Sequence, residues 1–339
     1  MNEYTLTPKI LENITSIERL YGQLEVLHLP KELQLNLERD NLVQSSYVSN
    51  SIEGNPLSLP EVTNLLLGDR VPTNRSEKEV RNYFDILKSL NKYRDDSLGV
   101  DTILAIHKQL IEGVDDGIAG VFRNERVVVG KYIRREDGKI ETKVKHEPPF
   151  HDQERISKAM EQLVEWLGSS EDLSVLKIGL FHHYYVHIHP FSDGNGRTVR
   201  LLTALLFLQN SYEINKYFVL DDYYDIDRQG YSDALHSADK GDSTKWLEYF
   251  TDGIKYSLQS ALAKAKKAVS SLKVSNRPTS REQEVMALFI TDDTEIITAD
   301  VVDALGVSRQ QAQNLLAGLV EKGLIAKYGS TKNSYYKLK

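Results

Sequence analysis

The sequence predicts a mainly helical protein with one β-hairpin and a separate C-terminal module of helices and strands. Three observations lead to this fold class. Apolar residues recur at helical spacing along most of the chain, two β-branched runs surround an Asp-Gly pair, and the pattern changes after a polar stretch near residue 273. Because the 339 residues are about twice a usual domain of roughly 100–200 residues, we expect two or three modules.

The composition excludes several classes of protein. With 40% hydrophobic and 27% charged residues the chain is close to globular averages, which excludes collagenous, low-complexity and wholly disordered proteins. The net charge of −7 argues against a nucleic-acid footprint over the whole chain, and the absence of Cys excludes disulfides and Cys-ligated zinc. The N-terminus has no basic stretch followed by an apolar one, and no apolar run approaches about 18 residues, so we expect a cytoplasmic protein without membrane contact.

The N-terminal region, residues 1–98, is predicted to be helical. Leu33, Leu37 and Leu42 recur among charged residues, and the two prolines at 56 and 60 break the run between two helices. A later helix is predicted from residue 76, where apolar side chains recur about every 3.6 residues: Val80, Tyr83, Phe84, Leu87 and Leu90.

Residues 99–272 are predicted to form a helical core that carries a hairpin near 120–146. The β-branched runs 126–130 and 139–144 surround Asp137-Gly138, which is a strong short-range hairpin signal. The sequence therefore predicts two antiparallel strands at this place in an otherwise helical region.

Two apolar helices follow the hairpin and enclose a glycine-rich loop. The first is predicted from Leu173 to Ile188 and is ended by Pro190, and the second runs from Val199 to Leu208. The loop between them concentrates charged, polar and glycine residues.

Residues 278–339 are predicted to form a separate module after a polar linker at 273–277. Helices are expected at 280–290, 298–305 and from Ser308 to about 322, and strands at 324–328 and 334–338. This pattern resembles a winged helix-turn-helix, which would contact DNA through the start of its third helix. The candidate contacts are Arg309, Gln310, Gln313 and Asn314.

The charge of this module is compatible with either DNA or protein as its partner. Residues 273–339 hold nine basic and eight acidic side chains, a net charge of +1, which is small for a surface that binds duplex DNA. A protein-binding or dimerisation module is therefore an equal alternative to a DNA-binding one.

The loop between the two apolar helices has the residue types of a phosphate site. Gly194 and Gly196 flank Asn195, so successive backbone N–H groups can turn toward one point, and the following helix adds its positive N-terminus. Arg197 and Arg200 are three residues apart and share a helix face, where guanidinium groups can bind phosphate oxygens. Two such groups beside one anion cradle indicate a polyphosphate ligand.

Three further residues complete this loop. Asp193 offers the single carboxylate that Mg²⁺ needs when substrate phosphates and water supply its other ligands. His189 has an imidazole that is mostly neutral at pH 7 and can accept a proton from an incoming hydroxyl, and Phe191 anchors the loop in the core. The sequence therefore predicts a Mg-nucleotide site with a general base.

Residues 189–200 match the motif H-x-F-x-[D/E]-G-N-G-R-x-x-R at every specified position, and the chain resembles the Fic family over residues 45–255. The resemblance implies a mainly helical Fic core that transfers AMP from ATP to a Tyr, Thr or Ser hydroxyl of a target protein or of itself. It implies His189 as the base and Asp193 as the Mg²⁺ ligand. The implied ATP-binding residues are Asp193, Gly194, Asn195, Gly196, Arg197, Thr198, Val199 and Arg200.

The residue at position 196 indicates whether AMP or phosphate is transferred. A related branch with Lys at this place is similar to kinase-like toxins that transfer phosphate, so the resemblance favours AMP transfer here. In both reactions catalysis comes mainly from positioning and charge neutralisation.

The same resemblance extends to two other places. Residues 120–130 look like the Fic flap, whose strand, including Val127, Val128, Val129 and Gly130, would contact ATP and align a target segment by main-chain hydrogen bonds. Tyr231 and Asp239 fall where the family builds part of its nucleotide pocket, although Ser232 stands where a second aromatic residue is common.

An inhibitory element is implied upstream of the core. Ser49, Glu53 and Gly54 match the family pattern [S/T]-x-x-x-E-[G/N], which places an inhibitory helix near 37–54. Glu53 would pair with Arg200, so that ATP binds only in a non-productive pose. In some relatives the equivalent Glu also positions water for removal of AMP, and dimerisation could tune such a helix.

Two rival functions come from other classes. His183 and His187 are four residues apart on one predicted helix face, as zinc ligands can be, although the H-E-x-x-H pattern is not present. A transcriptional regulator is the stronger rival, in which the C-terminal module binds DNA and the Fic core is a sensor or scaffold.

Overall fold

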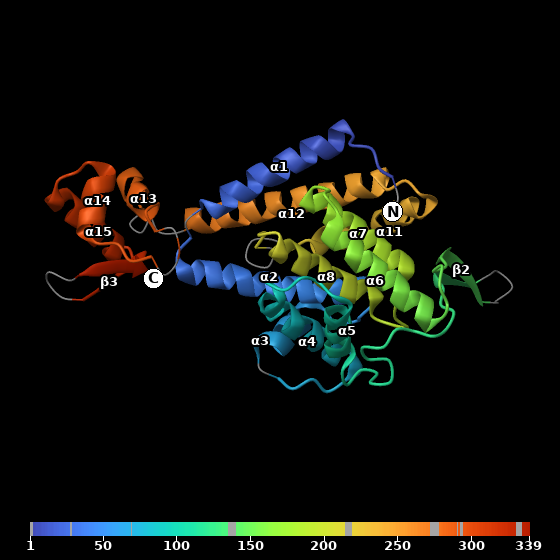
Figure 1. Cartoon of the computed structure of the whole chain (residues 1–339). Coiled ribbons are helices and arrows are strands. Elements are labelled where there is room, and N and C mark those ends of the chain that lie inside the picture. The colour runs from blue at the N-terminus through green and yellow to red at the C-terminus, as the bar shows by residue number, and fades with distance from the viewer. Residues whose placement is uncertain are drawn as a thin grey trace. The chain divides into compact units, whose positions relative to one another are not determined.

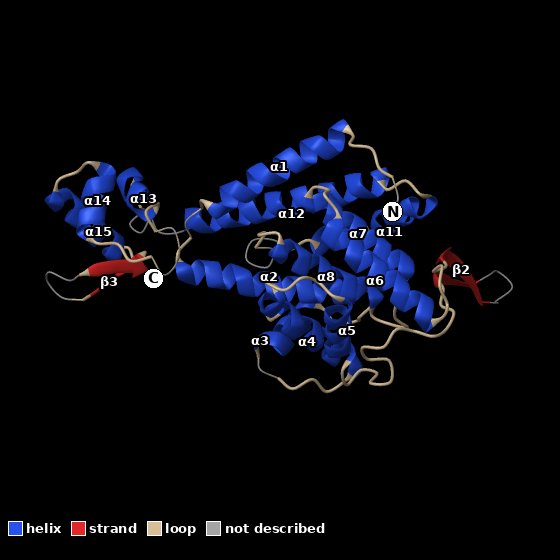
Figure 2. Cartoon of the chain, viewed as in Figure 1, coloured by secondary structure: helices blue, strands red, loops and turns tan. Residues whose placement is uncertain are grey.

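The computed structural model describes residues 3–27, 29–68, 70–134, 140–213, 219–271, 278–289, 291, 294–329 and 334–339 (Figure 1). In this part the chain is mainly helical with two small antiparallel sheets, which confirms the predicted fold class at this level (Figure 2). No helix among these residues is long and apolar enough to cross a membrane.

The chain divides into two compact units. The first comprises Met1–Glu18 and Asp40–Leu258, and the second comprises Arg19–Arg39 and Gln259–Lys339. From the N-terminus the first elements are α1 (Pro8–Glu25), α2 (Lys31–Ile52), α3 (Leu59–Leu67), α4 (Arg75–Lys88), η1 (Leu90–Tyr93), α5 (Val100–Ile111), β1 (Val129–Arg134) and β2 (Ile140–His146). They are followed by α6 (Gln153–Ser169), α7 (Ser174–Ile188), α8 (Asn195–Gln209), α10 (Asp221–Ile226), α11 (Arg228–Ser237), η2 (Ala238–Lys240) and α12 (Thr244–Ser271).

The centre of the first unit is the pair α7 and α8, which pack on each other and carry apolar residues around most of their circumference. Gly179 allows a close approach on one side of α7, because a Cβ at this position would lie only 2.8 Å from the Phe250 ring of α12. α6 packs on α7, while α4 and α5 contact α8 (Figure 1). The two central helices are therefore buried by neighbours on several sides, and the loop between them is held firmly at both ends.

The start of α8 differs from the sequence prediction. The helix begins at Asn195 rather than Val199, because Gly194 takes a left-handed conformation with φ of 76° and already stands at the N-cap position. Gly196 and Arg197 therefore lie in the first helical turn. The predicted end of the preceding helix at Ile188 is confirmed.

The predicted hairpin is present, with a later start. β1 and β2 pair antiparallel from Gly130↔Val144 to Arg134↔Ile140, and the register shifts between Val129 and Gly130. Residues 126–128 are outside the strand, so the predicted first strand begins too early. The backbone just before them contacts the glycine-rich loop instead, since Arg123 N donates to Pro190 O at 3.0 Å. The predicted turn at Asp137-Gly138 lies outside the described residues.

The C-terminal module of the second unit contains three helices and one strand pair: α13 (Ser280–Met286), α14 (Thr298–Leu305), α15 (Arg309–Glu321), β3 (Ile325–Tyr328) and β4 (Tyr335–Leu338). The α15 helix begins with a capping box, because Ser308 Oγ accepts from Gln311 N and Gln311 Oε1 accepts from Ser308 N. β3 and β4 pair antiparallel from Ile325↔Leu338 to Tyr328↔Tyr335. The expected linker at 273–277 lies outside the described residues.

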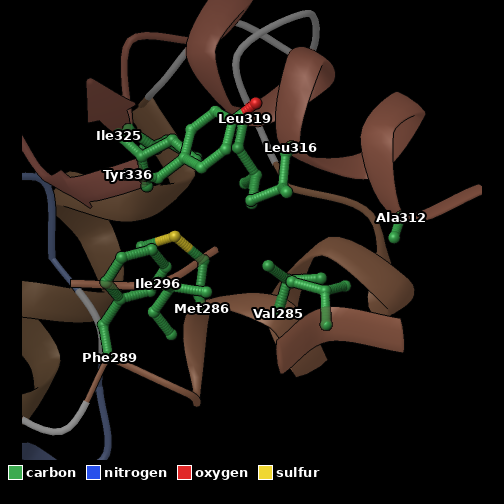
Figure 3. Close-up of a cluster of buried hydrophobic side chains, with 11 residues drawn as sticks. Val285, Met286, Phe289, Ile296, Ala312, Leu316, Leu319, Ile325 and Tyr336 are labelled. Carbon is green, nitrogen blue, oxygen red and sulfur yellow. The ribbon is translucent and has the colours of Figure 1, made fainter. Parts of the chain in front are cut away.

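A separate hydrophobic core holds this module together (Figure 3). Leu316 and Leu319 from α15 meet Val285 and Met286 from α13, and Tyr336 from β4 packs on the same core. The module therefore buries apolar side chains of its own rather than depending on the core around α7 and α8.

Candidate active site

The chain reverses sharply at His189, where α7 ends and the glycine-rich loop begins. His189 has a φ of 50°, in the left-handed region that side-chain-bearing residues seldom adopt, and its N–H still donates to Tyr185 O at 3.0 Å. Strain of this kind persists only where the surroundings enforce it. The surroundings that do so here come from other elements.

Arg123, in the segment before β1, is the main support of this turn. Its buried guanidinium donates from Nε to His189 O at 2.7 Å and from Nη2 to Ile188 O at 3.2 Å. A cation at the C-terminal end of α7 also complements the helix dipole. Arg123 thus fixes the backbone of His189, and nothing in its local sequence predicts this role.

His107 of α5 supports the loop from the other side. Its Nδ1 accepts from Gly120 N at 3.0 Å, which leaves the proton on Nε2 to donate to Asp193 O at 3.0 Å. The ring stacks on Phe191 with centroids 3.5 Å apart, and Phe191 is fully buried, as predicted for an anchor. Burial lowers the pKa of His107 to about 4, so this ring is neutral at pH 7.

The Asn195 side chain forms hydrogen bonds within the loop. It accepts from Phe191 N at 2.9 Å and donates to Phe191 O at 2.7 Å, so the amide closes the loop on itself. Thr198 and Val199 are fully buried, and Thr198 Oγ1 donates to Gly194 O at 2.8 Å. These three side chains shape the loop from within, while the backbone N–H groups at the start of α8 remain the anion-binding feature.

Arg200 is buried on the inner face of α8 and is contacted by the end of α2. Nε donates to Ser49 Oγ at 2.6 Å, and Nη2 donates to Ser49 O at 2.9 Å and to Glu53 Oε1 at 2.8 Å. The pair of Glu53 and Arg200 expected from the sequence is therefore present. Gly54 follows α2 in a left-handed conformation with φ of 88°.

The Glu53 carboxylate lies against the first turn of α8. A Cβ built on Gly196 would lie 2.1 Å from Glu53 Oε1, so a side chain at this position would displace the carboxylate from its present place. An anionic group thus already occupies the N-terminal end of α8 next to Arg200. This is where the sequence predicts a phosphate.

A second charge network surrounds Asp193 and Arg197. Asp193 Oδ1 accepts from Gly194 N at 2.6 Å, and Asp193 Oδ2 is 3.0 Å from Arg75 Nη2 of α4. Arg197 is buried, and its Nη groups lie 3.6 Å from Asp193 and 3.5 Å from Glu79. Among the described residues Arg197 Nε has no hydrogen-bond partner. Arg75 was not predicted, because nothing in its local sequence marks it.

The His189 side chain is poised to accept a proton. Nδ1 donates to Val186 O at 3.3 Å, so the neutral ring presents the Nε2 lone pair. Burial lowers the pKa of His189 to about 4, and the nearby His146 and Arg123 act in the same direction. An ordinary histidine is mostly neutral at pH 7, and burial makes the neutral form of His189 more favourable still.

The remaining candidates are described by their exposure and their contacts with other residues. Val127 and Val129 are partly exposed, and Val128 and Gly130 are exposed. Tyr231 is buried, and its hydroxyl is 2.8 Å from His182 Nε2. Asp239 is surrounded by histidines, whose hydrogen bonds outweigh burial and hold the pKa of its carboxyl well below the usual range.

Comparisons with known proteins agree with the motif. The Fic/DOC family model matches residues 97–207. The "Protein adenylyltransferase Fic" of Aedes aegypti is 27% identical over 261 residues, covering 73% of this chain and 48% of that protein. "Protein adenylyltransferase fic-1" of Caenorhabditis elegans is 27% identical over 225 residues, covering 63% and 40%. The chain thus spans about half the length of the curated relatives it matches.

Solved structures show the same fold. A Fic family protein from Desulfovibrio desulfuricans G20 has a TM-score of 0.66 at 26% identity, covering all of this chain and 98% of that one. Fic-1 (residues 134–508) from C. elegans has a TM-score of 0.61 at 24% identity, covering 76% and 73%. The chain is therefore similar to Fic proteins in two respects: residues 97–207 match the Fic/DOC family model, and the fold is that of solved Fic structures.

Proposed function

We propose that this chain is a protein adenylyltransferase that moves AMP from Mg-ATP to a hydroxyl side chain of a target protein or of itself. The observation that carries the proposal is the anion cradle at the start of α8, with two buried arginines and the His189 imidazole beside it. The family match and the names of the relatives support the same activity.

The cradle fits a polyphosphate. Glu53 acts as a stand-in anion, since its carboxylate lies at the first turn of α8 and pairs with Arg200. Arg197 adds a buried guanidinium whose Nε has no hydrogen-bond partner in the described part of the chain. When Glu53 leaves, the two arginines and the helix N-terminus would hold the β- and γ-phosphates of ATP.

Asp193 fits a Mg²⁺ ion that accompanies the nucleotide. Its side chain is 42% exposed at the loop, and a single carboxylate suffices when phosphates and water complete the coordination. The ion would neutralise phosphate charge as pyrophosphate departs. Arg75 has to yield its contact with Asp193 for this to happen.

His189 supplies the base for the transfer. Its Nε2 would take the proton from the target hydroxyl, whose oxygen then forms a bond to the α-phosphorus while the bond to pyrophosphate breaks. Arg123 holds the backbone of this residue, which keeps the ring in place. Asp239 is not assigned to the nucleotide, because four imidazoles already contact its carboxylate.

The hairpin is the proposed docking place for the target. Val127 and Val128 lead into β1, and Val129 and Gly130 begin it. Each strand of this two-stranded sheet has an outer edge that an extended target segment could pair with. Main-chain pairing would fix the register of the modified residue. The target class is therefore an extended segment that carries a hydroxyl side chain.

Glu53 makes the resting enzyme slow in this proposal. The carboxylate neutralises Arg200 and fills the space beside Gly196, so the γ-phosphate has to displace it. Ser49 holds the same guanidinium through two hydrogen bonds, which ties the end of α2 to the site.

Removing Glu53 should raise AMP transfer. We expect Glu53→Gly to increase labelling by at least about tenfold, because one charge-assisted contact is worth roughly 1.5–3 kcal/mol. The measurement is autolabelling with Mg²⁺ and ATP carrying label on either the α- or the γ-phosphate. The matched control, Glu53→Gly with His189→Ala, should show no label. Label from the γ-phosphate alone would indicate phosphate transfer, and Glu53→Gly labelling at the wild-type rate would disprove the inhibition.

Protonation of His189 should occur well below neutral pH. Because its folded-state pKa is lowered to about 4 from an unfolded value of about 6.5, the ring contributes stability above pH 6.5 that is lost as pH falls toward 4. A side-chain NMR titration, assigned with His189→Gln, should give a midpoint near 4. A midpoint near the ordinary value would mean that the ring is not desolvated.

Arg75 should compete with Mg²⁺ for Asp193. In the Glu53→Gly background we expect Arg75→Gln to lower the Mg²⁺ concentration for half-maximal labelling by about two- to fivefold, since an exposed ion pair is worth roughly 0.2–1 kcal/mol. Lys78→Gln on the same helix, whose Nζ contacts Gly113 O, is the control and should change nothing. Equal Mg²⁺ requirements in both variants would count against this competition.

DNA binding by the C-terminal module is a second candidate function. Arg309, Gln310, Gln313 and Asn314 are all exposed at the start of α15, which is the face that would enter a major groove. If the module binds DNA, fluorescence anisotropy of full-length protein with duplex DNA should show affinity that falls with salt and is lost in Arg309→Ala with Gln313→Ala. His189→Ala should leave that binding unchanged. Absence of binding at low salt would favour a protein-binding module.

A further inference from the structure

Four histidines from three parts of the first unit surround one carboxylate, that of Asp239 in η2. Oδ1 is 3.1 Å from His183 Nε2 and 2.8 Å from His187 Nδ1, both on α7. Oδ2 is 3.0 Å from His146 Nδ1 at the end of β2 and 3.0 Å from His236 Nδ1 on α11. This histidine cluster lies outside the glycine-rich loop and has no part in the transfer reaction proposed above.

The hydrogen bonds of His146 indicate a cation at this cluster. Its Nε2 is 2.9 Å from His187 O, a carbonyl that can only accept, so the ring proton belongs on Nε2. The Nδ1 lone pair then faces Asp239 Oδ2, and two lone pairs at 3.0 Å repel unless a positive charge separates them. Either a second proton on the ring or a metal ion can supply that charge. A histidine whose other nitrogen donates to a backbone carbonyl is the usual arrangement of a metal ligand.

The distances suit a metal ion. With bonds of about 2.1 Å, adjacent ligands around one ion lie roughly 3.0–3.4 Å apart, which is close to the separation of each histidine nitrogen from Asp239. The three ligand atoms of His146, His236 and Asp239 all lie within 4.8 Å of one another, and so do those of His183, His187 and Asp239.

The two triads differ in where a metal-binding histidine would carry its remaining ring proton. If His183 bound a metal through Nε2, its proton would sit on Nδ1, which is buried and has no hydrogen-bond partner in the described part of the chain. Leaving a donor buried and unsatisfied is costly. His146 has no such problem, because His187 O accepts its remaining proton. The observations therefore favour the triad of His146, His236 and Asp239 over the pair that the sequence spacing suggested.

We propose that His146, His236 and Asp239 bind one nitrogen-preferring divalent transition ion, of which Zn²⁺ is the representative. Two imidazoles and one carboxylate suit this class rather than Mg²⁺, which prefers oxygen ligands. His236 and Asp239 have side chains that are each 19% exposed, so water can reach the fourth position and the ion can enter. The bound ion would link the end of β2 to α11 and η2, and so fix the base of the hairpin.

The test is Zn²⁺ binding by untagged full-length protein after chelator treatment. Isothermal titration should show about one equivalent bound in the presence of millimolar Mg²⁺, and Co²⁺ should give the visible spectrum of a nitrogen-ligated ion. His236→Gln should weaken binding by at least about tenfold. His151→Gln, an exposed histidine outside the cluster, is the matched control and should bind like the wild type.

Two results would overturn the proposal. The first is that wild-type protein, shown by circular dichroism to be folded, binds Zn²⁺ no more tightly than His236→Gln. A proton on His146 would then be the positive charge that separates its Nδ1 from Asp239 Oδ2. The other is loss of binding in His187→Gln with retention in His236→Gln, which would move the ion to the other triad. If His236→Gln loses its native spectrum, His146→Gln provides the same comparison.

Discussion

The Arg200 guanidinium is the group on which the arrangement of this site depends. It is buried on α8, and a buried charge without partners would be strongly destabilising. Three hydrogen bonds from the end of α2, two to Ser49 and one to Glu53, satisfy it. The anion beside Arg200 therefore offsets part of the cost of burying its charge. In the resting state that anion is a carboxylate, and in the proposed active state it is a phosphate.

In the proposed function, this pairing with an anion links inhibition to substrate binding. Because Gly196 has no side chain, the same space accepts either the Glu53 carboxylate or a ligand oxygen. The end of α2 needs to move only enough to release one ion pair, since Ser49 can keep its two bonds to Arg200. In the proposed function, Mg²⁺ would similarly replace Arg75 beside Asp193. That ion pair is weaker, because both side chains are more exposed. Inhibition and activation thus differ in which anion or cation occupies each position.

The sequence suggested a chemistry for the loop, because its residues are contiguous and each has a characteristic type. It also predicted the ion pair of Glu53 and Arg200, through a family pattern rather than through local physics. It could not predict Arg123, His107 or Arg75, which reach the loop from segments 66–118 positions away and carry no local signal. The true start of α8 was missed because Gly194 caps the helix four residues earlier than the apolar pattern suggests.

The histidine cluster shows the same limit in another form. His183 and His187 were noticed because they are four residues apart, but this spacing identified only one side of the Asp239 carboxylate. The other side is formed by His146 and His236, which only the fold brings together. The choice between the two sides depends on which nitrogen of each histidine ring carries the proton. Tertiary contacts determine this, and the spacing of residues in the sequence does not indicate it. The cation at this cluster and the cation at Asp193 would also differ in kind, because imidazole nitrogens surround one and oxygen ligands the other. One domain can therefore hold two ions without competition between them.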